Sequence, residues 1–329
     1  MGKSKWRLLI GLAGYTAALV VVTGAAQAQK FPDRPVRLVV PYPSGASSND
    51  ILARQLAPKL TERWRQNVVV DNRSGASGNI GAELVARSPA DGYTLLYGTG
   101  GLLSIGPHLY TRLAYDPHKD LAPVAMIAVV PYLLVINAAL PVKNLEEFIA
   151  YARARPGKLS FASSGVGGTP HLCVELLKIM AGIDLLHVPY KGGAPAVVDT
   201  IGGQTQAYCA GLAATMPHVR SGKLRALGVT TLKRSAGAPD IPTLDEQGLK
   251  GFDVNSWGAI FVPSRTPKAV IETLHTAIAA VMNTDAMRDT LIKQGMDPIL
   301  LGPQALATHI KVESANWAKV VKTAGIRME

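Results

Sequence analysis

Short apolar runs alternate with segments of helical apolar spacing along most of this chain. Residues 36–40 form a Val/Leu-rich run, and residues 49–63 place apolar side chains three and four positions apart. Runs of the first kind predict strands at 36–40, 68–70, 93–97, 126–136, 159–162, 183–188, 206–209, 225–229 and 259–262. Segments of the second kind predict helices at 49–63, 80–86, 145–155, 170–181, 268–283, 285–294 and from 304 onward. The alternation predicts an α/β fold with a mostly parallel sheet.

Four loops rich in glycine and hydroxyl side chains follow predicted strands, and most of them precede a helix. They span residues 44–49, 74–78, 99–101 and 163–169. Open α/β sheets bind ligands beyond the carboxyl ends of their strands, where these loops fall. Glycine admits a ligand close to the backbone, hydroxyl groups donate and accept, and helix N-termini offer free N–H groups to an anion. One such loop alone would fit an ordinary turn, but four together predict a shared cleft for a carboxylate.

Neutral loops can supply enough binding energy for this purpose. Micromolar affinity corresponds to about −8 kcal/mol. A hydrogen bond to a charged group contributes about 1.5–3 kcal/mol, and a helix terminus adds about 1 kcal/mol. Three to five donors therefore reach this range without an arginine.

The first 28 residues have the composition of a secretory signal peptide. A basic start at Lys3, Lys5 and Arg7 precedes an apolar run at 8–22, and Ala26-Gln27-Ala28 is a small-x-small site. We expect cleavage after Ala28 and a periplasmic protein. The alternative is a membrane anchor, but the run is shorter than the roughly 20 residues that a span needs.

Charge and cysteine content narrow the function classes. The formal net charge is +11, of which three charges lie in the first 28 residues, leaving +8. A basic excess suits an anionic ligand, whereas the scattered Lys and Arg argue against nucleic acid. Cys173 and Cys209 are the only cysteines, so one disulfide is permitted in an oxidising compartment. The favoured interpretation is nevertheless two buried, unpaired cysteines.

Six short motifs occur in order between residues 41 and 257. They read PYPSGASSNDILAR at 41–54, NRSGASGNIG at 72–81, ADGYTLL at 90–96, HVPYKG at 187–192, SGKLRAL at 221–227 and GFDVNSW at 251–257. Together they resemble the Bug family, the substrate-binding proteins of tripartite tricarboxylate transporters. The resemblance extends from about Phe31 to the end of the chain.

The resemblance implies a type II periplasmic-binding-protein fold with a ligand cleft between two lobes. Lobe one would comprise residues 29–130 plus 254–329, and lobe two residues 131–253. Backbone N–H groups, hydroxyls and ordered waters would hold the ligand carboxylate. The lobe-one candidates by position are Ser44, Gly45, Ala46, Ser47, Ser48, Asn49, Gly75, Ala76, Ser77, Thr99 and Gly100. The lobe-two candidates are Ser164, Gly165, Gly167, Thr169, Ala210 and Gly211, with His171 as a hydrogen-bond donor.

Two positions depart from the family pattern. Ala46 replaces the second of two adjacent glycines, and the segment to Asp50 is one residue longer. The turn at Cys209-Ala210-Gly211 stands where relatives often carry Phe-Asp. If that aspartate reads an amino group or a hydroxyl, its absence predicts a less polar, bulkier carboxylate rather than an amino acid.

Enzyme motifs are missing from the sequence. It contains no Gly-x-Ser-x-Gly elbow and no P-loop, and the glycines at Gly98 and Gly100 lack the third member of a dinucleotide fingerprint. His171 and Glu175 could share a metal ion, but a histidine at a helix start near the cleft with an exposed glutamate is the commoner arrangement. Trp257 fits either a packed aromatic near the hinge or a wall of the cleft. We expect no catalysis, cofactor or metal.

These observations predict a periplasmic solute-binding protein that captures a small carboxylate. It would deliver the ligand to a membrane permease of the tripartite tricarboxylate type. The alternative is a protein that presents its ligand to a periplasmic sensor kinase, and a third hypothesis is a periplasmic hydrolase. A monomer without nucleic-acid partners is expected in each case.

Overall fold

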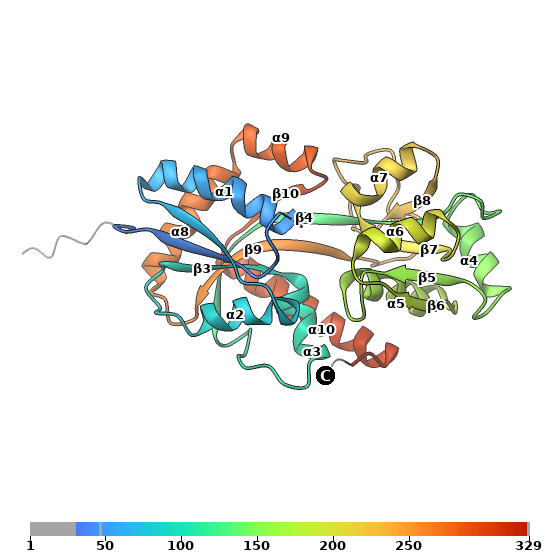
Figure 1. The fold of residues 1–329 in the computed structure, drawn as a ribbon, viewed down its shortest axis with the longest axis horizontal. Helices are drawn as coiled ribbons and strands as arrows, with labels where there is room; N and C mark the ends of the chain where they lie inside the picture. Colours follow the sequence, from blue (N-terminus) through green and yellow to red (C-terminus); the bar gives the residue numbers. More distant parts are fainter. Residues whose placement is uncertain (1–30, 46–47, 328–329) are drawn as a thin grey trace, which may run out of the picture. The chain divides into compact units, whose positions relative to one another are not determined.

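Helices and strands alternate along the computed structural model, which describes residues 31–45 and 48–327 (Figure 1). The first elements are β1 (Val36–Val40), α1 (Ser48–Trp64), β2 (Val68–Asn72), α2 (Asn79–Ala86), β3 (Thr94–Thr99), α3 (Gly106–Leu109) and β4 (Leu121–Asn137). Then follow α4 (Leu145–Arg153), β5 (Ser160–Ser163), α5 (Thr169–Ala181), β6 (Leu186–Pro189), α6 (Gly193–Ile201), β7 (Ala207–Gly211), α7 (Leu212–Arg220) and β8 (Leu224–Val229). The last are β9 (Asn255–Pro263), α8 (Lys268–Met282), α9 (Asp285–Lys293), β10 (Asp297–Leu301) and α10 (Pro303–Ala324).

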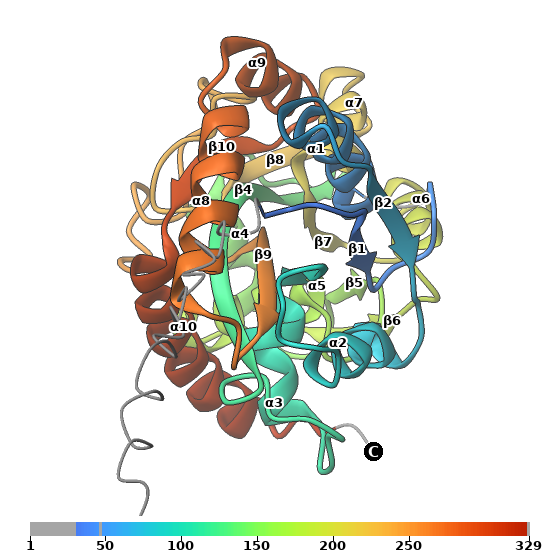
Figure 2. The same ribbon diagram turned by 90° about the vertical axis from the view of Figure 1, so that its left-hand side faces the viewer.

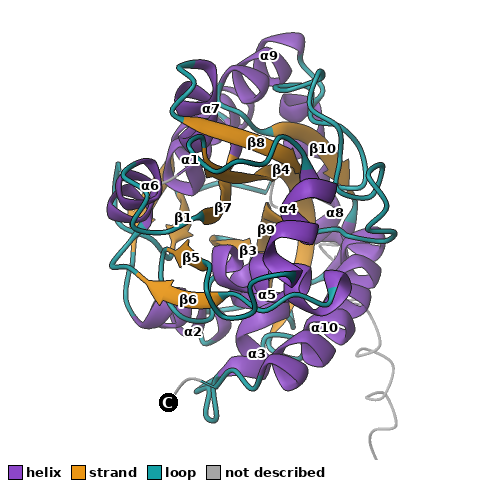
Figure 3. Ribbon diagram, turned by 90° about the vertical axis from the view of Figure 1, so that its right-hand side faces the viewer, coloured by secondary structure: helices purple, strands orange, loops and turns teal. Residues whose placement is uncertain are grey.

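The strands form two groups that share β4. The first group has the order β2-β1-β3-β9-β4 with β10 beside β4, and Figure 2 shows it with α1, α2 and α8 around it. The second group continues from β4 through β7 and β5 to β6, with β8 on β4, and Figure 3 shows it with α6 and α7. The fold is therefore α/β with two lobes.

A mostly parallel sheet is wrong as a description of the whole. The pairs among β1, β2 and β3 and among β5, β6 and β7 are parallel, as predicted. All described pairs that involve β4 or β9 are antiparallel. Whether neighbouring strands run parallel or antiparallel depends on how β4 and β9 pass between the two groups. Local hydrophobic periodicity does not encode this property.

β4 changes partner at a proline. It pairs with β9 as far as Pro131, opposite Asn255, and with β7 from Tyr132, opposite Gly211. Proline has no N–H to donate, and it is tolerated where a strand's ladder ends or shifts. At Pro131, β4 therefore passes from the first group of strands into the second.

The carboxyl ends of the two parallel groups point toward each other along β4. Thr99, at the end of β3, pairs in register with Gly258 of β9. Gly258 in turn pairs in register with Ala128 of β4. At the end of β7, Gly211 lies level with Tyr132. Four residues of strand separate these levels, or about 13 Å at roughly 3.3 Å per residue. This spacing suits a small molecule.

The last helix contributes to the cores of both groups. Leu306 and Ile310, near its start, pack with Trp257 and other residues of the first group. Trp317 and Val320, two to three turns later, pack with the second-group cluster that contains Phe161 and Phe252. α10 therefore spans both halves of the fold.

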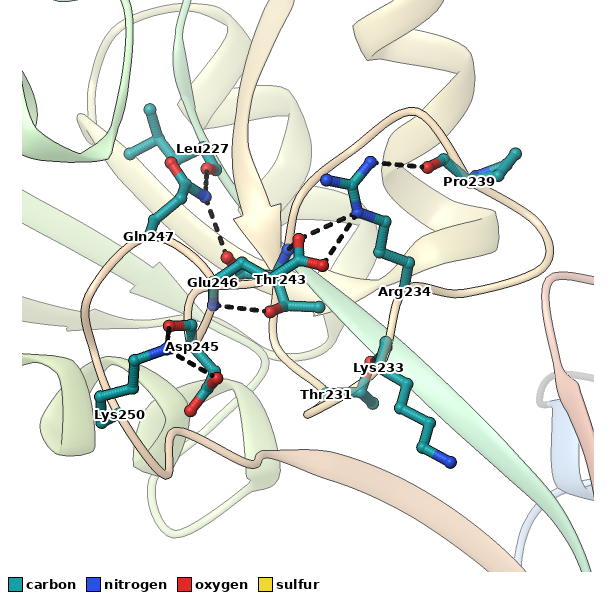
Figure 4. Close-up of polar contacts among 10 residues, drawn as sticks. All are labelled: Leu227, Thr231, Lys233, Arg234, Pro239, Thr243, Asp245, Glu246, Gln247 and Lys250. Atoms are coloured by element: carbon teal, nitrogen blue, oxygen red, sulfur yellow. Dashed lines mark hydrogen bonds and ion pairs between the residues drawn. The ribbon is translucent and has the colours of Figure 1, made fainter.

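A polar network orders the long connection between β8 and β9. The Arg234 guanidinium donates to Glu246, and Glu246 and Thr243 bond each other's main-chain N–H reciprocally (Figure 4). Asp245 accepts from the Gly251 N–H and pairs with Lys250 at 3.3 Å. Such local pairs replace the regular hydrogen bonds that this segment lacks.

The predicted signal peptide and the predicted cleavage after Ala28 lie outside the described residues. Within residues 31–45 and 48–327, no helix combines the length and apolar character that a bilayer crossing requires.

Candidate functional site

The predicted ligand loops lie at the strand ends that face each other along β4. Those of the first group follow β1, β2 and β3, and those of the second follow β5 and β7. Ala46 and Ser47 lie outside the described residues, and the side chain of Ser48 is not described. Thr99, Ala210 and Gly211 lie at the carboxyl ends of β3 and β7, and the remaining described candidates lie in the loops or in the first residues of the helices that follow.

A buried carboxylate fixes the first loop. Asp50 is the third residue of α1 and has no exposed surface. Its Oδ2 accepts the main-chain N–H of Gly45 at 2.7 Å, and Gly45 has a φ of +73° that favours glycine. The helix that follows this loop therefore holds the loop's own backbone.

Arg54 and Asn72 complete this network and join the first loop to the second. Arg54 donates through Nε to Asp50 at 2.9 Å and through Nη2 to Ser44 at 2.9 Å and Asn72 at 2.7 Å. Asn72, the last residue of β2, donates through Nδ2 to Asp50 Oδ1 at 2.7 Å. The loops after β1 and β2 thus have one common anchor.

The environment of Asp50 keeps it ionised. Burial acts to raise the pKa of its carboxyl, but hydrogen bonds from Arg54, Asn72 and Gly45 and the charge of Arg54 outweigh burial, so the pKa falls below its usual value. The positive charge of Arg54 thus balances the negative charge of Asp50 beside the loop at which an anionic ligand is predicted to bind.

The second loop combines exposure with a strained backbone. Gly75, Ala76, Ser77 and Gly78 all have positive φ, at 129°, 45°, 55° and 99°. Ala76 and Ser77 are both exposed, and such a conformation costs a non-glycine residue about 1–3 kcal/mol. Strain that no local packing explains is a common property of binding sites, which supports this loop as a candidate.

The third loop rests on a buried tryptophan. Thr99 is buried, and its Oγ1 lies 2.6 Å from Tyr42 Oη. Gly100 lies against Trp257, which has no exposed surface and donates its indole N–H to Glu313 Oε2 at 2.8 Å. Trp257 is therefore a packed core residue beneath the loop and not a wall of the cleft.

Replacing Gly100 by alanine is expected to destabilise the protein by about 1–3 kcal/mol. An added Cβ would lie 2.8 Å from Trp257 Nε1, although the backbone of Gly100 (φ −55°) accepts alanine. Urea unfolding followed by tryptophan fluorescence measures the loss. Gly101→Ala is the matched control, because its nearest atom would lie 3.8 Å away. Equal stabilities of the two variants would contradict the expectation.

The fourth loop repeats the geometry of the first with a different acceptor. Gly167 has a φ of +74°, and its N–H donates to Nδ1 of His171 at 3.1 Å. His171 is the third residue of α5, as Asp50 is of α1. Its Nε2 lies 3.7 Å from Glu175 Oε1, while Glu175 pairs with Lys178 at 3.0 Å. Both ring nitrogens of His171 therefore face groups of the protein.

These bonds decide which amides remain as donors. The N–H groups of Gly45 and Gly167 donate to Asp50 and His171, and that of Gly165 lies 3.2 Å from Ser163 Oγ. In a helix, the first N–H groups have no partner within the helix. The donors available to an anion thus come from the first turns of the helices rather than from these three glycines.

Residues at the inner end of the second group are mostly buried. Thr169 is buried, and burial raises the pKa of Tyr132 to about 12 despite a hydrogen bond with Thr169. Ala210 is buried and Gly211 is half-buried, whereas Val166 is 45% exposed. Ser164 and Gly165 are half-buried. The most exposed side chain of the fourth loop, Val166, is therefore apolar.

The two cysteines form a disulfide, so the preference for buried, unpaired cysteines is wrong. Cys173 of α5 is bonded to Cys209 of β7. Their Cα atoms are 6.3 Å apart, although 36 positions separate them in the sequence. The bond joins the helix after the fourth loop to the strand that ends at Ala210 and Gly211.

Two surface hollows lie outside the predicted ligand-binding loops, although one of them includes Arg54, which contacts the first loop. One, of about 450 Å³, lies beside α1 and β2 and includes Arg54 and Thr61. The other, of about 430 Å³, is lined by residues of β9 and α10 and by His108 and His118. Neither contains a predicted ligand-binding residue, so the candidate site rests on the strand-end geometry.

The sequence-based candidates omit the side chains that fix the loops. Asp50, Arg54, Asn72 and His187 contact loop residues or the groups that hold them. One signal was present in the sequence, because a polar acceptor follows the first and the fourth glycine loops at the third position of a helix. Bonds such as that of Arg54 to Asn72 depend on tertiary contacts.

Comparison with known proteins gives matches along nearly the whole chain. A family model described as the tripartite tricarboxylate transporter family receptor matches residues 52–326. The BugT protein of Bordetella pertussis is 36% identical over 322 residues, covering 98% of both chains.

Two solved structures are similar in fold and sequence. An R. palustris protein solved with adipate is 41% identical, with a TM-score of 0.79 over 90% of this chain and 99% of that one. MatC from Rhodopseudomonas palustris, solved with bound malate, is 31% identical with a TM-score of 0.73, over 88% of this chain and all of the other.

Proposed function

Because this chain belongs to the tripartite tricarboxylate transporter receptor family, we propose that it captures a small carboxylate and delivers it to a membrane permease. Members of the family are periplasmic solute-binding receptors and not enzymes. Export, with removal of residues 1–28, is part of the proposal. The observation that carries it is the arrangement of strand ends, which face each other across about 13 Å of β4.

The proposed division places lobe one at residues 29–130 plus 254–329 and lobe two at 131–253. The change of partner at Pro131, opposite Asn255, supports these boundaries. α10 would belong to lobe one by sequence, although its Trp317 and Val320 pack in the other core. Closure would be a hinge motion of β4 and β9.

The ligand in this proposal is a dicarboxylate or another carboxylate with an apolar body. Relatives solved with adipate and malate support the carboxylate. At the end of β7, Cys209 is in a disulfide and Ala210 and Gly211 offer no acidic group for an ammonium. Exposed Val166 would contact the ligand body. The net charge of +8 after residue 28 also favours an anion.

A thermal-shift screen tests the ligand class. Adipate and malate are compared with mono- and tricarboxylates and with glutamate as the amino-acid contrast. Ligand at 100 times its Kd adds about 2.7 kcal/mol, which raises the Tm by about 5 °C. We expect adipate to exceed glutamate clearly. If no carboxylate shifts the Tm, carboxylate capture is wrong, and if only glutamate does, the apolar preference is wrong.

Chemical crosslinking of the ligand-loaded protein to membrane proteins distinguishes the two proposed partners. A permease subunit among the products supports transport. Recovery of a sensor kinase instead would favour the signalling alternative.

A further inference from the structure

Two histidine rings stack directly beneath the fourth loop. The ring centroids of His171 and His187 are 3.7 Å apart, and the ring planes differ by 8°. Phe161 stacks on His187 at 4.9 Å. We propose that His171 and His187 are positioning residues that set the shape of this loop, and through it the affinity for the carboxylate. The inference rests on the proposed function.

His171 determines the direction of the Gly167 amide. Its Nδ1 accepts the Gly167 N–H at 3.1 Å, so this nitrogen carries no proton. The proton of the neutral ring is then on Nε2, on the side of Glu175 Oε1. Because His171 is only 5% exposed, no water can replace it readily as the acceptor. Loss of this ring leaves the Gly167 peptide free to turn.

His187 holds the start of the loop through Ser163. Ser163 Oγ lies 3.0 Å from the carbonyl oxygen of Gly165 and 2.7 Å from Nε2 of His187. A hydroxyl has one proton, and the Gly165 carbonyl can only accept it. His187 Nε2 must therefore donate to Ser163, which also receives the Gly165 N–H at 3.2 Å. The Ser163 hydroxyl then donates one hydrogen bond and accepts two.

Two protonated imidazole rings at this separation would repel each other. Burial and the neighbouring His171 lower the pKa of His187 to about 4, with Lys178 acting in the same direction and Glu175 opposing it. At neutral pH His187 is therefore neutral and can lie face to face with a second imidazole. The charged groups that face the pair are Glu175 and Lys178, which neutralise each other at 3.0 Å.

The comparison with the first loop explains why a neutral acceptor suits this position. Asp50 and His171 each accept the N–H of a glycine whose φ is near +74°, from the third position of the following helix. Asp50 is compensated by Arg54 at 2.9 Å. A second buried carboxylate at position 171 would oppose an anionic ligand, whereas an imidazole holds the same amide without charge.

Paired substitutions separate positioning from packing. His171→Asn keeps an acceptor near the place of Nδ1, and His187→Gln keeps a donor near the place of Nε2. His171→Leu and His187→Leu keep volume but lose these groups. Adipate binding is measured by calorimetry at pH 7.5, with the Tm as a check of folding. We expect each leucine variant to bind at least 10-fold more weakly, and the Asn and Gln variants to stay within about threefold of the original protein.

A measurement without ligand keeps the two proposals distinguishable. Hydrogen exchange of the Gly167 amide should be protected in the original protein and in His171→Asn, and should accelerate at least 10-fold in His171→Leu. Unchanged exchange and unchanged affinity in His171→Leu would overturn the positioning role, as would equal loss in the Leu and Asn variants. Protected exchange in a protein that binds no carboxylate would support the loop geometry while rejecting the proposed function.

Discussion

Replacing Asp50 by alanine is expected to lower the free energy of unfolding by about 3 kcal/mol and to abolish ligand binding. Asp50 is fully buried and accepts bonds from Gly45, Arg54 and Asn72. Its removal leaves the Gly45 N–H and one of the two Nδ2 hydrogens of Asn72 without their acceptor, while Asn72 still donates to the carbonyl oxygen of Tyr42. Arg54 is 47% exposed and can turn to water, which limits the loss. Urea unfolding and calorimetry with adipate measure the two effects.

Glu62→Ala is the matched control for the Asp50 substitution. Glu62 lies on the same helix, its side chain is 78% exposed, and its Oε2 lies 4.0 Å from Nζ of Lys59. Such surface pairs contribute about 0–1 kcal/mol. A loss at Asp50 no larger than that at Glu62 would show that the network does not hold the loop.

The stabilising effect of Asp50 should depend on pH in a defined direction. Its pKa is lower in the folded protein than in the unfolded chain, so the contribution is complete above the ordinary aspartate pKa of about 4. It is lost as the pH falls through the lower, folded value. The stability difference between the original protein and Asp50→Ala should therefore shrink in strong acid, and a difference that grows there would contradict this assignment.

Removing the disulfide by Cys173→Ala with Cys209→Ala is expected to lower the free energy of unfolding by about 4 kcal/mol. The bond closes a loop of 36 positions, which restricts the unfolded chain. Both cysteines are fully buried, so lost packing adds to the effect. Equilibrium unfolding in urea, with and without a reductant, measures it. The original protein should lose stability with reductant, whereas the double variant serves as the control and should not respond.

Thiol titration of the unfolded protein gives an independent check on the disulfide. The non-reduced chain should show no free thiol and the reduced chain two. Two thiols without reductant would mean that the cysteines are unpaired, as the sequence alone suggested. The bond ties α5 to β7, so its loss should also weaken adipate binding at the lobe-two loop.

Much of the fold follows from local patterns, but some elements do not. The strand at Val36–Val40 and the helix at Lys268–Met282 are readable because apolar periodicity marks them. β10 at Asp297–Leu301 is half-buried throughout and contains Pro298, so it shows no alternation, and its continuous apolar run is limited to residues 299–301. α6 at Gly193–Ile201 begins with Gly and Pro, which are typical of a turn. Packing on the neighbouring strands decides these segments.

The loops of the candidate site were predictable, whereas the groups that fix them were not. Gly75 and Gly167 stand where the backbone needs positive φ, and glycine after a strand is a visible signal. The pairing of Cys173 with Cys209, and of His171 with His187, joins positions far apart in the sequence. Their proximity depends on the order of β5, β6 and β7, which only the assembled sheet determines.

The packing of α10 restricts how the two halves can move. A pair of strands alone would permit both bending and twisting at Pro131 and Asn255. The helix adds a rigid strut, fastened near one end through Leu306 and farther along through Trp317. Rotation of one strand group toward the other would therefore move one end of α10 relative to the residues against which it packs. We therefore expect α10 to limit the rotation of one strand group against the other.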